Sequence, residues 1–131
     1  MKIIQHIALN CRDHKAQEQF YTRHFNFRRS RVFNAGQPDE FVMLRLGDTC
    51  LELFTARPEH RNQAAGPQPV GFSHLAFEVP DLDAAVAKLR ADNIKTEEII
   101  DCSWVTPGLR ICFFHDPDGN RIELMQGYKD E

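Results

Sequence analysis

The sequence predicts an α+β fold built from two tandem βαβββ modules, and an internal repeat carries this prediction. The segment HIALNCRD, which begins at His6, matches HLAFEVPD, which begins at His74, at an offset of 68 residues. Near the end of each half, GDTCLELF matches DGNRIELM, which pairs Glu52 with Glu123 at an offset of 71 residues. Near-constant offsets of this kind indicate two copies of one supersecondary unit.

The first half shows the alternation and capping signals of such a module. In the opening segment small and polar residues alternate with Ile7 and Leu9, as in a strand with one buried face. Asp13 stands where a helix N-cap is expected, and Phe20 and Phe25 follow at roughly helical spacing. The predicted elements are, in order, a strand at 3–10, a helix at 14–25 and strands at 27–33, 41–46 and 50–54.

The second half repeats this order. Asp81 is a second N-cap, and Leu82, Val86 and Leu89 give the helix that follows an apolar face. The predicted elements are a strand at 72–79, the helix after Asp81, a strand at 94–99, a loop at 101–108 that carries Trp104, and strands at 109–115 and 121–126.

A linker separates the two halves. Residues 56–70 are rich in Pro, Gly, Gln, Ala and Asn and show no hydrophobic period. We therefore expect module one at 1–55, the linker at 56–70 and module two at 71–131. The 131 residues have the length of one domain with a proper core.

The segment 113–125, FFHDPDGNRIELM, is predicted to be a hairpin whose second strand carries a carboxylate. In the turn DPDGN, Pro presets φ, Gly119 supplies a positive φ, and the Asp and Asn side chains can bind the turn backbone. Beyond the turn, Arg121 and Glu123 share one strand face. A charge therefore lies in the middle of an otherwise apolar strand.

Composition and charge narrow the classes of function. A formal net charge of −3 does not provide the basic surface of a nucleic-acid-binding protein. The N-terminal segment lacks the apolar core of a signal peptide and no apolar run reaches membrane-spanning length, so we expect a cytoplasmic protein that contacts neither nucleic acid nor membrane. The cysteines, Cys11, Cys50, Cys102 and Cys112, have no CxxC or zinc-finger spacing and are expected to be reduced thiols in or near the core.

The paired βαβββ order, the DPDGN turn and the matched His and Glu positions resemble the vicinal oxygen chelate superfamily. This superfamily includes glyoxalase I, methylmalonyl-CoA epimerase, extradiol dioxygenases, fosfomycin-resistance proteins and bleomycin-binding proteins. The resemblance covers essentially the whole chain and implies that the two modules curl their sheets into one cup-like mixed sheet, with helices on the convex side. The cup is expected to hold one divalent metal ion, and the implied ligands are His6, Glu52, His74 and Glu123.

The chemistry of these four residues agrees with that implication. Two imidazoles and two carboxylates suit Ni, Zn, Co, Mn or Fe(II) and leave positions for water or substrate. Strand alternation places all four on the face opposite the bulky apolar residues that point toward the helices. Because a single strand histidine is more often structural, the prediction depends on the match of four ligand-type residues in the two copies.

The resemblance implies a divalent-metal-dependent lyase or isomerase of the glyoxalase I type, which stabilises the enediolate of a small oxygen-chelating substrate such as a hemithioacetal. Glu123 or Glu52 would take the proton from the carbon next to the carbonyl, and the sequence leaves open which one acts. One alternative is another enzyme of the superfamily: an epimerase, a fosfomycin-type thiol transferase or an Fe(II) extradiol dioxygenase. The other is a non-catalytic binding or resistance protein. The retained Glu52 argues against the transferase and the dioxygenase, which leave that position free.

Two positions depart from the members that use glutathione. Those members usually carry an Arg four residues after the first metal His and an Asn four residues after the first metal Glu. This chain has Asn10 and Ala56 there. We expect Asn10 to contact the substrate, and whether a thiol such as glutathione takes part stays open.

Further residues are predicted to line the cup. Arg45, Arg110 and Arg121 would face inward, where they suit a substrate with a carboxylate, phosphate or phosphonate group. The alternative is that they are rim residues that reach solvent or pair with Glu78. Trp104 is expected either to form a lid or pocket wall or to pack on the surface.

The resemblance also implies a homodimer. Some members exchange modules, so that each metal site takes one His–Glu pair from each chain. The linker is long enough for either arrangement, so we expect a homodimer that binds a small-molecule substrate and leave the sharing of sites open.

Overall fold

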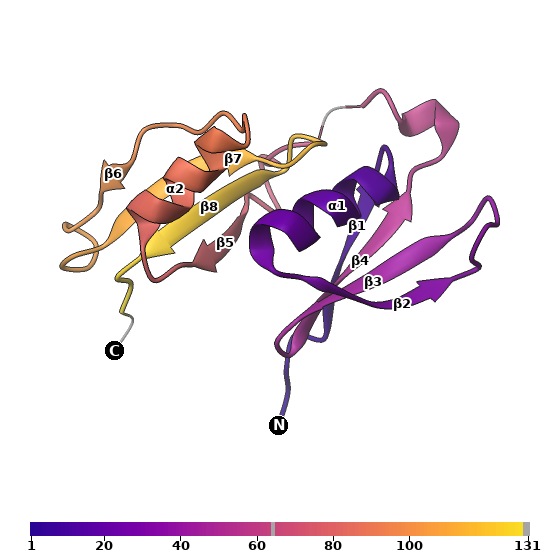
Figure 1. Ribbon diagram of the computed structural model, residues 1–131, viewed down its shortest axis with the longest axis horizontal. Helices are drawn as coiled ribbons and strands as arrows, with labels where there is room; N and C mark the ends of the chain where they lie inside the picture. Colours follow the sequence, from indigo (N-terminus) through magenta and orange to yellow (C-terminus); the bar gives the residue numbers. More distant parts are fainter. Residues whose placement is uncertain (64, 130–131) are drawn as a thin grey trace. The chain divides into compact units, whose positions relative to one another are not determined.

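The computed structural model describes residues 1–63 and 65–129 and contains both predicted modules (Figure 1). The chain divides into two compact units, residues 1–64 and 65–131. In its described part, each unit has one α-helix and one open, four-stranded mixed sheet. The prediction of an α+β fold with two βαβββ modules is therefore confirmed.

Unit one follows the predicted order. Its elements are β1 (His6–Cys11), α1 (His14–Phe25), β2 (Arg28–Phe33), β3 (Phe41–Leu46) and β4 (Thr49–Thr55), followed by a short 3₁₀ turn, Pro58–His60. The strand order in the sheet is β1-β4-β3-β2. β1 runs parallel to β4, and the other pairs are antiparallel.

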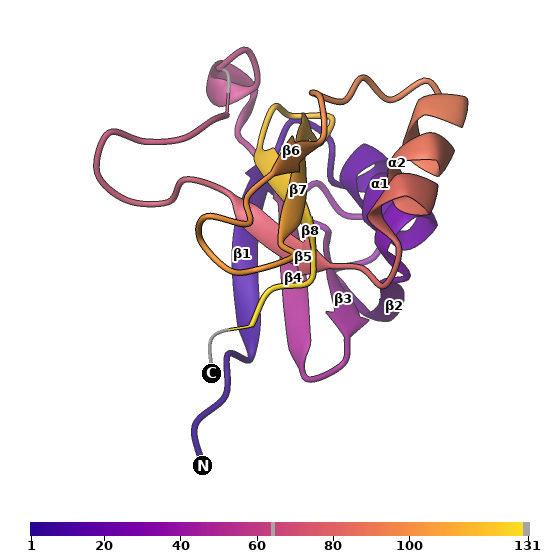
Figure 2. The same cartoon turned by 90° about the vertical axis from the view of Figure 1, so that its left-hand side faces the viewer.

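The first helix begins and ends where its local signals require. Asp13 accepts a hydrogen bond from the backbone N–H of Lys15 at 2.9 Å, and Asn26 ends the helix in the left-handed conformation with φ 58°. α1 lies to one side of β1 and β4 (Figure 2). On that side Tyr21 and Leu53 are fully buried, so the core of the unit lies between the helix and its sheet.

A buried histidine fastens the start of α1. His14 is only 7% exposed; its Nδ1 lies 2.6 Å from Thr55 Oγ1, and its Nε2 lies 2.7 Å from Glu40 Oε2. The backbone N–H of Gly36 donates to the other oxygen of Glu40 at 3.0 Å. This N–H and His14 hold the pKa of the Glu40 carboxyl below its ordinary value. The cluster joins the helix to the end of β4 and to the loop before β3.

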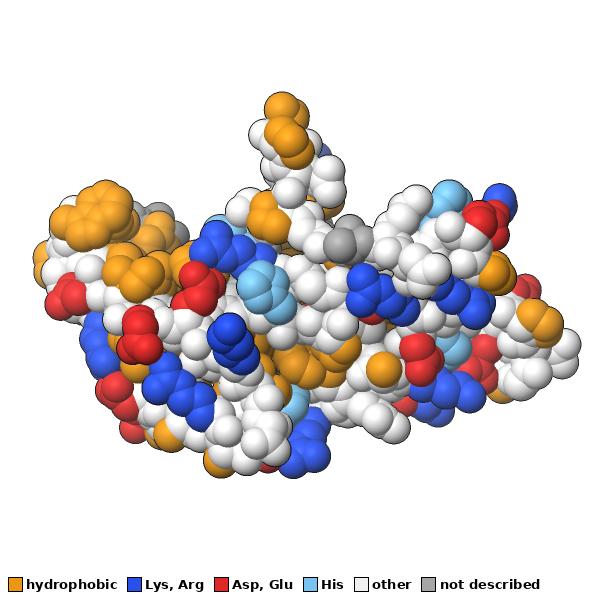
Figure 3. Space-filling model, turned by 90° about the horizontal axis from the view of Figure 1, so that it is seen from above, with side chains coloured by type: hydrophobic (Ala, Val, Ile, Leu, Met, Phe, Trp, Pro, Cys, Tyr) orange, Lys and Arg blue, Asp and Glu red, His pale blue; other side chains and the backbone are white. Residues whose placement is uncertain are grey.

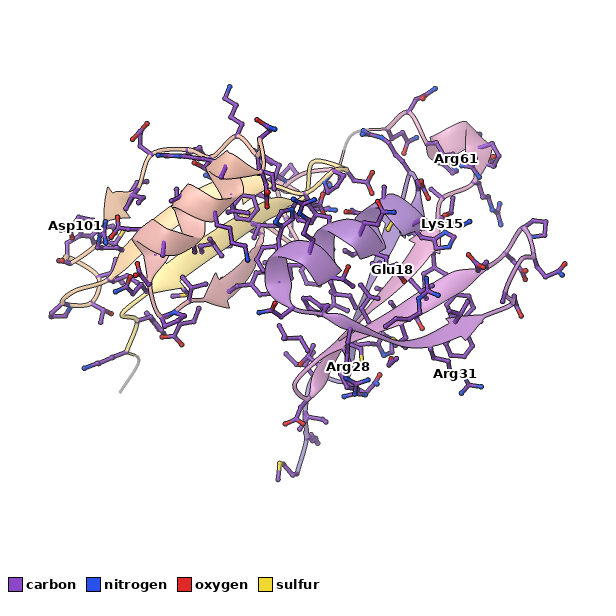
Figure 4. All side chains as sticks on the ribbon, viewed as in Figure 1. Lys15, Glu18, Arg28, Arg31, Arg61 and Asp101 are labelled. Atoms are coloured by element: carbon purple, nitrogen blue, oxygen red, sulfur yellow. The ribbon has the colours of Figure 1, made fainter. Side chains whose placement is uncertain are left out.

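Surface ion pairs join each helix to its own sheet. Glu18, which Figure 4 shows on α1, accepts from Arg29 Nε of β2 at 2.9 Å, and this contact raises the pKa of the Arg29 guanidinium. In unit two Asp83 accepts from both terminal nitrogens of Arg110, at 2.7 and 2.9 Å. Each pair is bidentate, the geometry that best matches a guanidinium to a carboxylate.

Unit two repeats the architecture of unit one. Its elements are β5 (Leu75–Glu78), α2 (Leu82–Ala91), β6 (Ile100–Asp101), β7 (Arg110–His115) and β8 (Arg121–Gln126), in the sheet order β5-β8-β7-β6. Asp81 caps α2 by accepting from the backbone N–H of Ala84 at 3.0 Å. Val86 of the helix and Phe114 and Ile122 of the sheet form the buried core.

The predicted strand at 94–99 is wrong. Asn93 has φ 62° and the N–H of Ile94 still bonds to Leu89 O, so the chain is leaving the helix at this point. Only Thr96 forms an isolated bridge, with Phe114, before the regular pairing of β6 begins. The pairing register with β7 shifts by one residue between the two contacts, which breaks the ladder into two short pieces.

The first strands of both modules are shorter at their N-terminal ends than predicted. The strand predicted at 72–79 begins at Leu75, because Gly71 has φ 125° and Phe72 O accepts from the N–H of Gln68 in a turn. Likewise β1 begins at His6. His74 therefore directly precedes its strand, whereas His6 is the first residue of its own.

Two predictions from composition can be compared with the described residues. All four cysteines are free and buried, which confirms the expectation of core thiols. In the described part of the chain no helix is both long and apolar enough to cross a membrane.

Candidate metal centre

In unit one the predicted ligands His6 and Glu52 lie on adjacent parallel strands. The register pairs Ala8 of β1 with Glu52 of β4, so His6, two residues before Ala8, projects from the same face. His6 Nε2 lies 3.9 Å from Glu52 Oε1, and the two side chains are 44% and 18% exposed. The methyl group of Ala8 leaves the space between the imidazole and the carboxylate open.

Unit two repeats this arrangement residue for residue. Ala76 of β5 pairs with Glu123 of β8, and His74 precedes Ala76 by two residues. His74 Nε2 lies 2.8 Å from Glu123 Oε2, with side chains 31% and 13% exposed. The structure therefore brings each predicted ligand together with the other ligand of its own module.

The other ring nitrogen of each histidine is held by the preceding residue. Gln5 Oε1 lies within hydrogen-bond distance of His6 Nδ1, and Ser73 Oγ lies 2.9 Å from His74 Nδ1. Metal-binding histidines in proteins usually have such a partner, which sets the ring orientation and the tautomer. These two residues were not among the predicted site residues, although they share the offset of 68 that links the histidines.

Each pair fits one half of a metal site. An imidazole nitrogen and a carboxylate oxygen that face each other suit Ni, Zn, Co, Mn or Fe(II). Within residues 1–63 and 65–129, no three or more His, Cys, Asp or Glu side chains are grouped so that they could hold a metal ion. Protein metal sites of this kind use three or four protein ligands, so neither pair is a complete site by itself.

Two predicted substrate-binding residues of unit one lie on the sheet face from which His6 and Glu52 project, here called the ligand face. Asn10 follows His6 by four positions on β1 and is exposed. Arg45 alternates with the buried Val42 and Leu44 and lies on the same face as Glu52. Its Nη1 donates to Gly47 O at 3.2 Å.

In unit two, Arg121 shares the face of Glu123, two residues along β8. Its guanidinium lies over the Phe113 ring, 3.7 Å from the centroid, and 3.6 Å from Glu97 Oε2. The His74 ring makes an edge contact with the same phenylalanine at 5.4 Å. The Phe113 ring thus packs beside the His74–Glu123 pair, and the Arg121 guanidinium lies over the face of the ring.

The prediction that Arg110 faces inward is wrong. Cys112 and Phe114 are 0% and 1% exposed on the helix side of β7, and Arg110 alternates in phase with them and pairs with Asp83 of α2. Phe113, one residue before Phe114, lies opposite Glu123 in the register.

Trp104 packs against little of the chain. Its residue is 85% exposed in the loop after β6, where Figure 4 labels the nearby Asp101. The Asp101 carboxylate accepts from the hydroxyl and the backbone N–H of Ser103 at 2.6 and 2.8 Å, which lowers the pKa of Asp101. The loop is therefore fixed at its start, while the indole ring extends from it into solvent.

An aromatic row on the ligand face of unit one was not predicted. The Phe33 and Phe41 rings stack at 4.5 Å, and Phe54 follows at 4.7 Å. Arg31 lies 4.6 Å from the centroid of Phe33. Alternation in each strand carried the signal, since Phe54 is two residues after Glu52. Over the molecular face shown in Figure 3, Lys and Arg side chains are interspersed with Asp and Glu side chains.

A family model places the chain among known proteins. The model of the Glyoxalase/Bleomycin resistance protein/Dioxygenase superfamily matches residues 3–124. The chain is 34% identical to the uncharacterized protein YaeR of Escherichia coli (strain K12), over 96% of this chain and 97% of YaeR. It is 39% identical over 90 residues to a 2-epi-5-epi-valiolone epimerase of Actinomyces sp, covering 64% of this chain and 49% of that enzyme.

Solved structures agree with the family model. A glyoxalase family protein from Enterococcus faecalis has a TM-score of 0.74 and 31% identity, over 95% of this chain and 97% of that chain. Lactoylglutathione lyase from Agrobacterium tumefaciens has a TM-score of 0.67 and 25% identity, over 97% and 95%. The fosfomycin resistance protein FosX from Listeria monocytogenes, solved with Mn(II) and a sulfate ion, has a TM-score of 0.71 and 16% identity over 100% and 97%, and shows the fold alone.

Proposed function

The chain belongs to the Glyoxalase/Bleomycin resistance protein/Dioxygenase superfamily, and from this premise we propose that it is a divalent-metal-dependent lyase or isomerase of the glyoxalase I type. The observation that carries the proposal is the repeated His–Glu pair. The same two residue types face each other at the same register in both modules.

His6, Glu52, His74 and Glu123 would together hold the ion. A bound divalent cation supplies a Lewis acid that polarises two neighbouring substrate oxygens. The structure of FosX with Mn(II) supports a divalent metal as the bound ion, because FosX is a member of the superfamily that binds one. Arg45 and Arg121 lie on the ligand faces of their own sheets and suit an anionic group of the substrate.

The chemical role of the chain itself is to move a proton at the carbon next to a carbonyl. A carboxylate within reach of that carbon serves as the general base. Glu123 is held by His74 at 2.8 Å, whereas Glu52 lies 3.9 Å from His6. Either glutamate would serve as that base, while the other would stay a ligand of the ion.

Two members of this reaction class fit the comparisons. Likeness to the lactoylglutathione lyase favours hemithioacetal isomerisation, and likeness to the valiolone epimerase favours epimerisation beside a carbonyl. Both reactions begin with removal of the same kind of proton. Asn10 and Ala56 stand where glutathione-dependent members usually carry Arg and Asn, so hemithioacetals of several thiols should be compared.

Elemental analysis of protein purified without chelator tests the metal site. We expect one divalent metal per site in the wild type. Two double variants should lose the metal: one combines His6→Ala with Glu52→Ala, and the other combines His74→Ala with Glu123→Ala. The matched control is Glu59→Ala, His60→Ala, which removes a Glu and a His from the 3₁₀ turn and should keep the metal. Wild-type protein without metal, even after reconstitution, would refute the proposal.

We further propose a homodimer, and complementation decides whether its chains share sites. The two double variants each lack one half of the donor set. If each site takes one pair from each chain, a mixture of the two variants regains metal in half of its sites within mixed dimers. If each chain supplies both pairs, the mixture stays without metal.

A further inference from the structure

We propose that Gln5 and Ser73 are positioning residues for the two histidines, each holding Nδ1 of the residue that follows it so that Nε2 faces the carboxylate of its own module. This inference rests on the proposed function, because it gives the histidines their task as metal ligands. The two residues are equivalent in the repeat, at the same offset of 68 as His6 and His74. Their chemical types differ, and this difference predicts different behaviour.

The contact of Gln5 fixes one tautomer of His6. The amide oxygen of Gln5 lies at His6 Nδ1, while its amide nitrogen lies 3.9 Å from Cys50 Sγ, the sulfur of a fully buried residue. An amide oxygen only accepts, so His6 Nδ1 must carry the proton. Nε2 then presents a lone pair on the side of Glu52, ready for a cation.

The contact of Ser73 permits either tautomer of His74. A hydroxyl both donates and accepts, and the ring has Ser73 Oγ at 2.9 Å on one side and Glu123 Oε2 at 2.8 Å on the other. At 2.8 Å without a metal, His74 Nε2–H donates to Glu123 and the hydroxyl of Ser73 donates to Nδ1. With a cation held at Nε2, the ring proton would lie on Nδ1, and the hydroxyl of Ser73 would accept from it.

The two half-sites therefore differ in their readiness. Unit one holds its imidazole in the tautomer that suits a metal ligand, whereas unit two holds its imidazole in a hydrogen bond that a metal ion would have to replace. Both anchors act through the histidines and contact neither the proposed metal nor the substrate.

Long-range proton–nitrogen NMR correlations of the metal-free protein measure the tautomers directly. We expect the Nδ1–H form for His6 and the Nε2–H form for His74. Addition of Zn²⁺ should convert His74 to the Nδ1–H form and leave the tautomer of His6 unchanged. Assignment of the two rings uses His6→Gln and His74→Gln. His6 in the Nε2–H form, or His74 already in the Nδ1–H form without metal, would overturn the inference.

Competition with a chromophoric chelator measures Zn²⁺ affinity in the anchor variants. We expect Gln5→Ala and Ser73→Ala each to weaken binding by roughly 10- to 100-fold, the usual effect of losing such a partner. Gln63→Ala is a matched control, because Gln63 Nε2 lies 3.3 Å from His60 Nδ1 outside the site, and it should bind like the wild type. The exchanged anchors Gln5→Ser and Ser73→Gln should recover affinity, and Gln5→Ser should also free the tautomer of His6.

The outcomes separate this inference from the proposed function. Metal-free wild type after reconstitution refutes the proposed function, and the tautomers of the metal-free protein still test the anchors. Tight Zn²⁺ binding by the wild type and equally by both alanine variants refutes the anchors and leaves the proposed function standing. Gln5 and Ser73 are exposed, and circular dichroism shows whether each variant keeps its fold.

Discussion

The turn before β8, the strand that carries Glu123, offers a sharp test of which contacts stabilise unit two. Asp116 is 4% exposed, and its Oδ1 accepts from the backbone N–H groups of Asp118 and Asn120, both at 3.0 Å. Its Oδ2 accepts from the side-chain amide of Asn120 at 2.8 Å. Asp116→Ala removes both acceptor oxygens, and with them all three hydrogen bonds, and leaves the donors in a partly buried turn.

The expected loss follows from these contacts. A hydrogen bond to a charged group contributes about 1.5–3 kcal/mol, and a buried donor without a partner costs about 1–3 kcal/mol. The three bonds are not additive because Asn120 is partly exposed and water can replace its partner. We therefore expect Asp116→Ala to lower the free energy of unfolding by about 2–4 kcal/mol, and Asp116→Asn by about 1 kcal/mol, since an amide oxygen can still accept at Oδ1.

Urea unfolding followed by far-ultraviolet circular dichroism measures this loss. Asp48→Ala is the matched control, because Asp48 is an exposed aspartate in the corresponding turn of unit one, and we expect a change within about 0.5 kcal/mol. If the two units unfold in separate steps, Asp116→Ala should shift only one of them. A loss for Asp116→Ala as small as that of the control would refute the assignment of the turn as a determinant of stability.

Three further predictions use other contacts. The folded-state pKa of Glu40 lies below its ordinary value of 4.5, so its contacts stabilise the protein above pH 4.5 and this stabilisation is lost as the pH falls through the folded-state pKa. Glu40→Gln should therefore flatten the acid side of a plot of unfolding free energy against pH, and an unchanged plot contradicts this. Arg110→Ala should leave Zn²⁺ affinity and substrate turnover unchanged because Arg110 pairs with α2, whereas Arg121→Ala should weaken the binding of anionic substrates; equal effects in steady-state kinetics argue against the assigned faces. Acrylamide should quench the exposed Trp104 in the folded protein nearly as well as in urea, and strong protection of its fluorescence would indicate that a partner or a ligand covers the ring.

Local signals predicted the elements whose causes are local. The start of α1 follows from Asp13, which caps it, and the cap at Asp81 was found in the same way. The turn DPDGN and the positive φ of Gly119, 92° in the structure, were also predicted. Each of these features depends on a few neighbouring residues, and a sequence shows such neighbours directly.

The errors arise where tertiary packing decides which residues of a strand face the helix and which residues pair across the sheet. Residues 111–114, ICFF, are all apolar, so alternation could not show which of them face α2, and Arg110 was assigned to the wrong face. The strand expected at 94–99 fails because its pairing with β7 slips by one residue, which no local signal marks. The repeat marked His6 and His74, and Glu52 and Glu123, as equivalent positions, and the structure brings the His and the Glu of each module together.

The division of the chain into two compact units, each with half of the donor set, has a thermodynamic consequence for the whole chain. A ligand that needs donors from both units binds only when both units are folded. Its binding therefore raises the free energy of unfolding of either unit by the same amount. At a free metal concentration of 100 times Kd this penalty is about 2.7 kcal/mol. If one chain supplies both pairs, two domains that would melt separately then melt together. If the pairs come from different chains, the same ion stabilises the dimer. In both cases a metal ion bound as proposed would link the two units reversibly, and the concentration of the free ion would set how cooperatively they unfold.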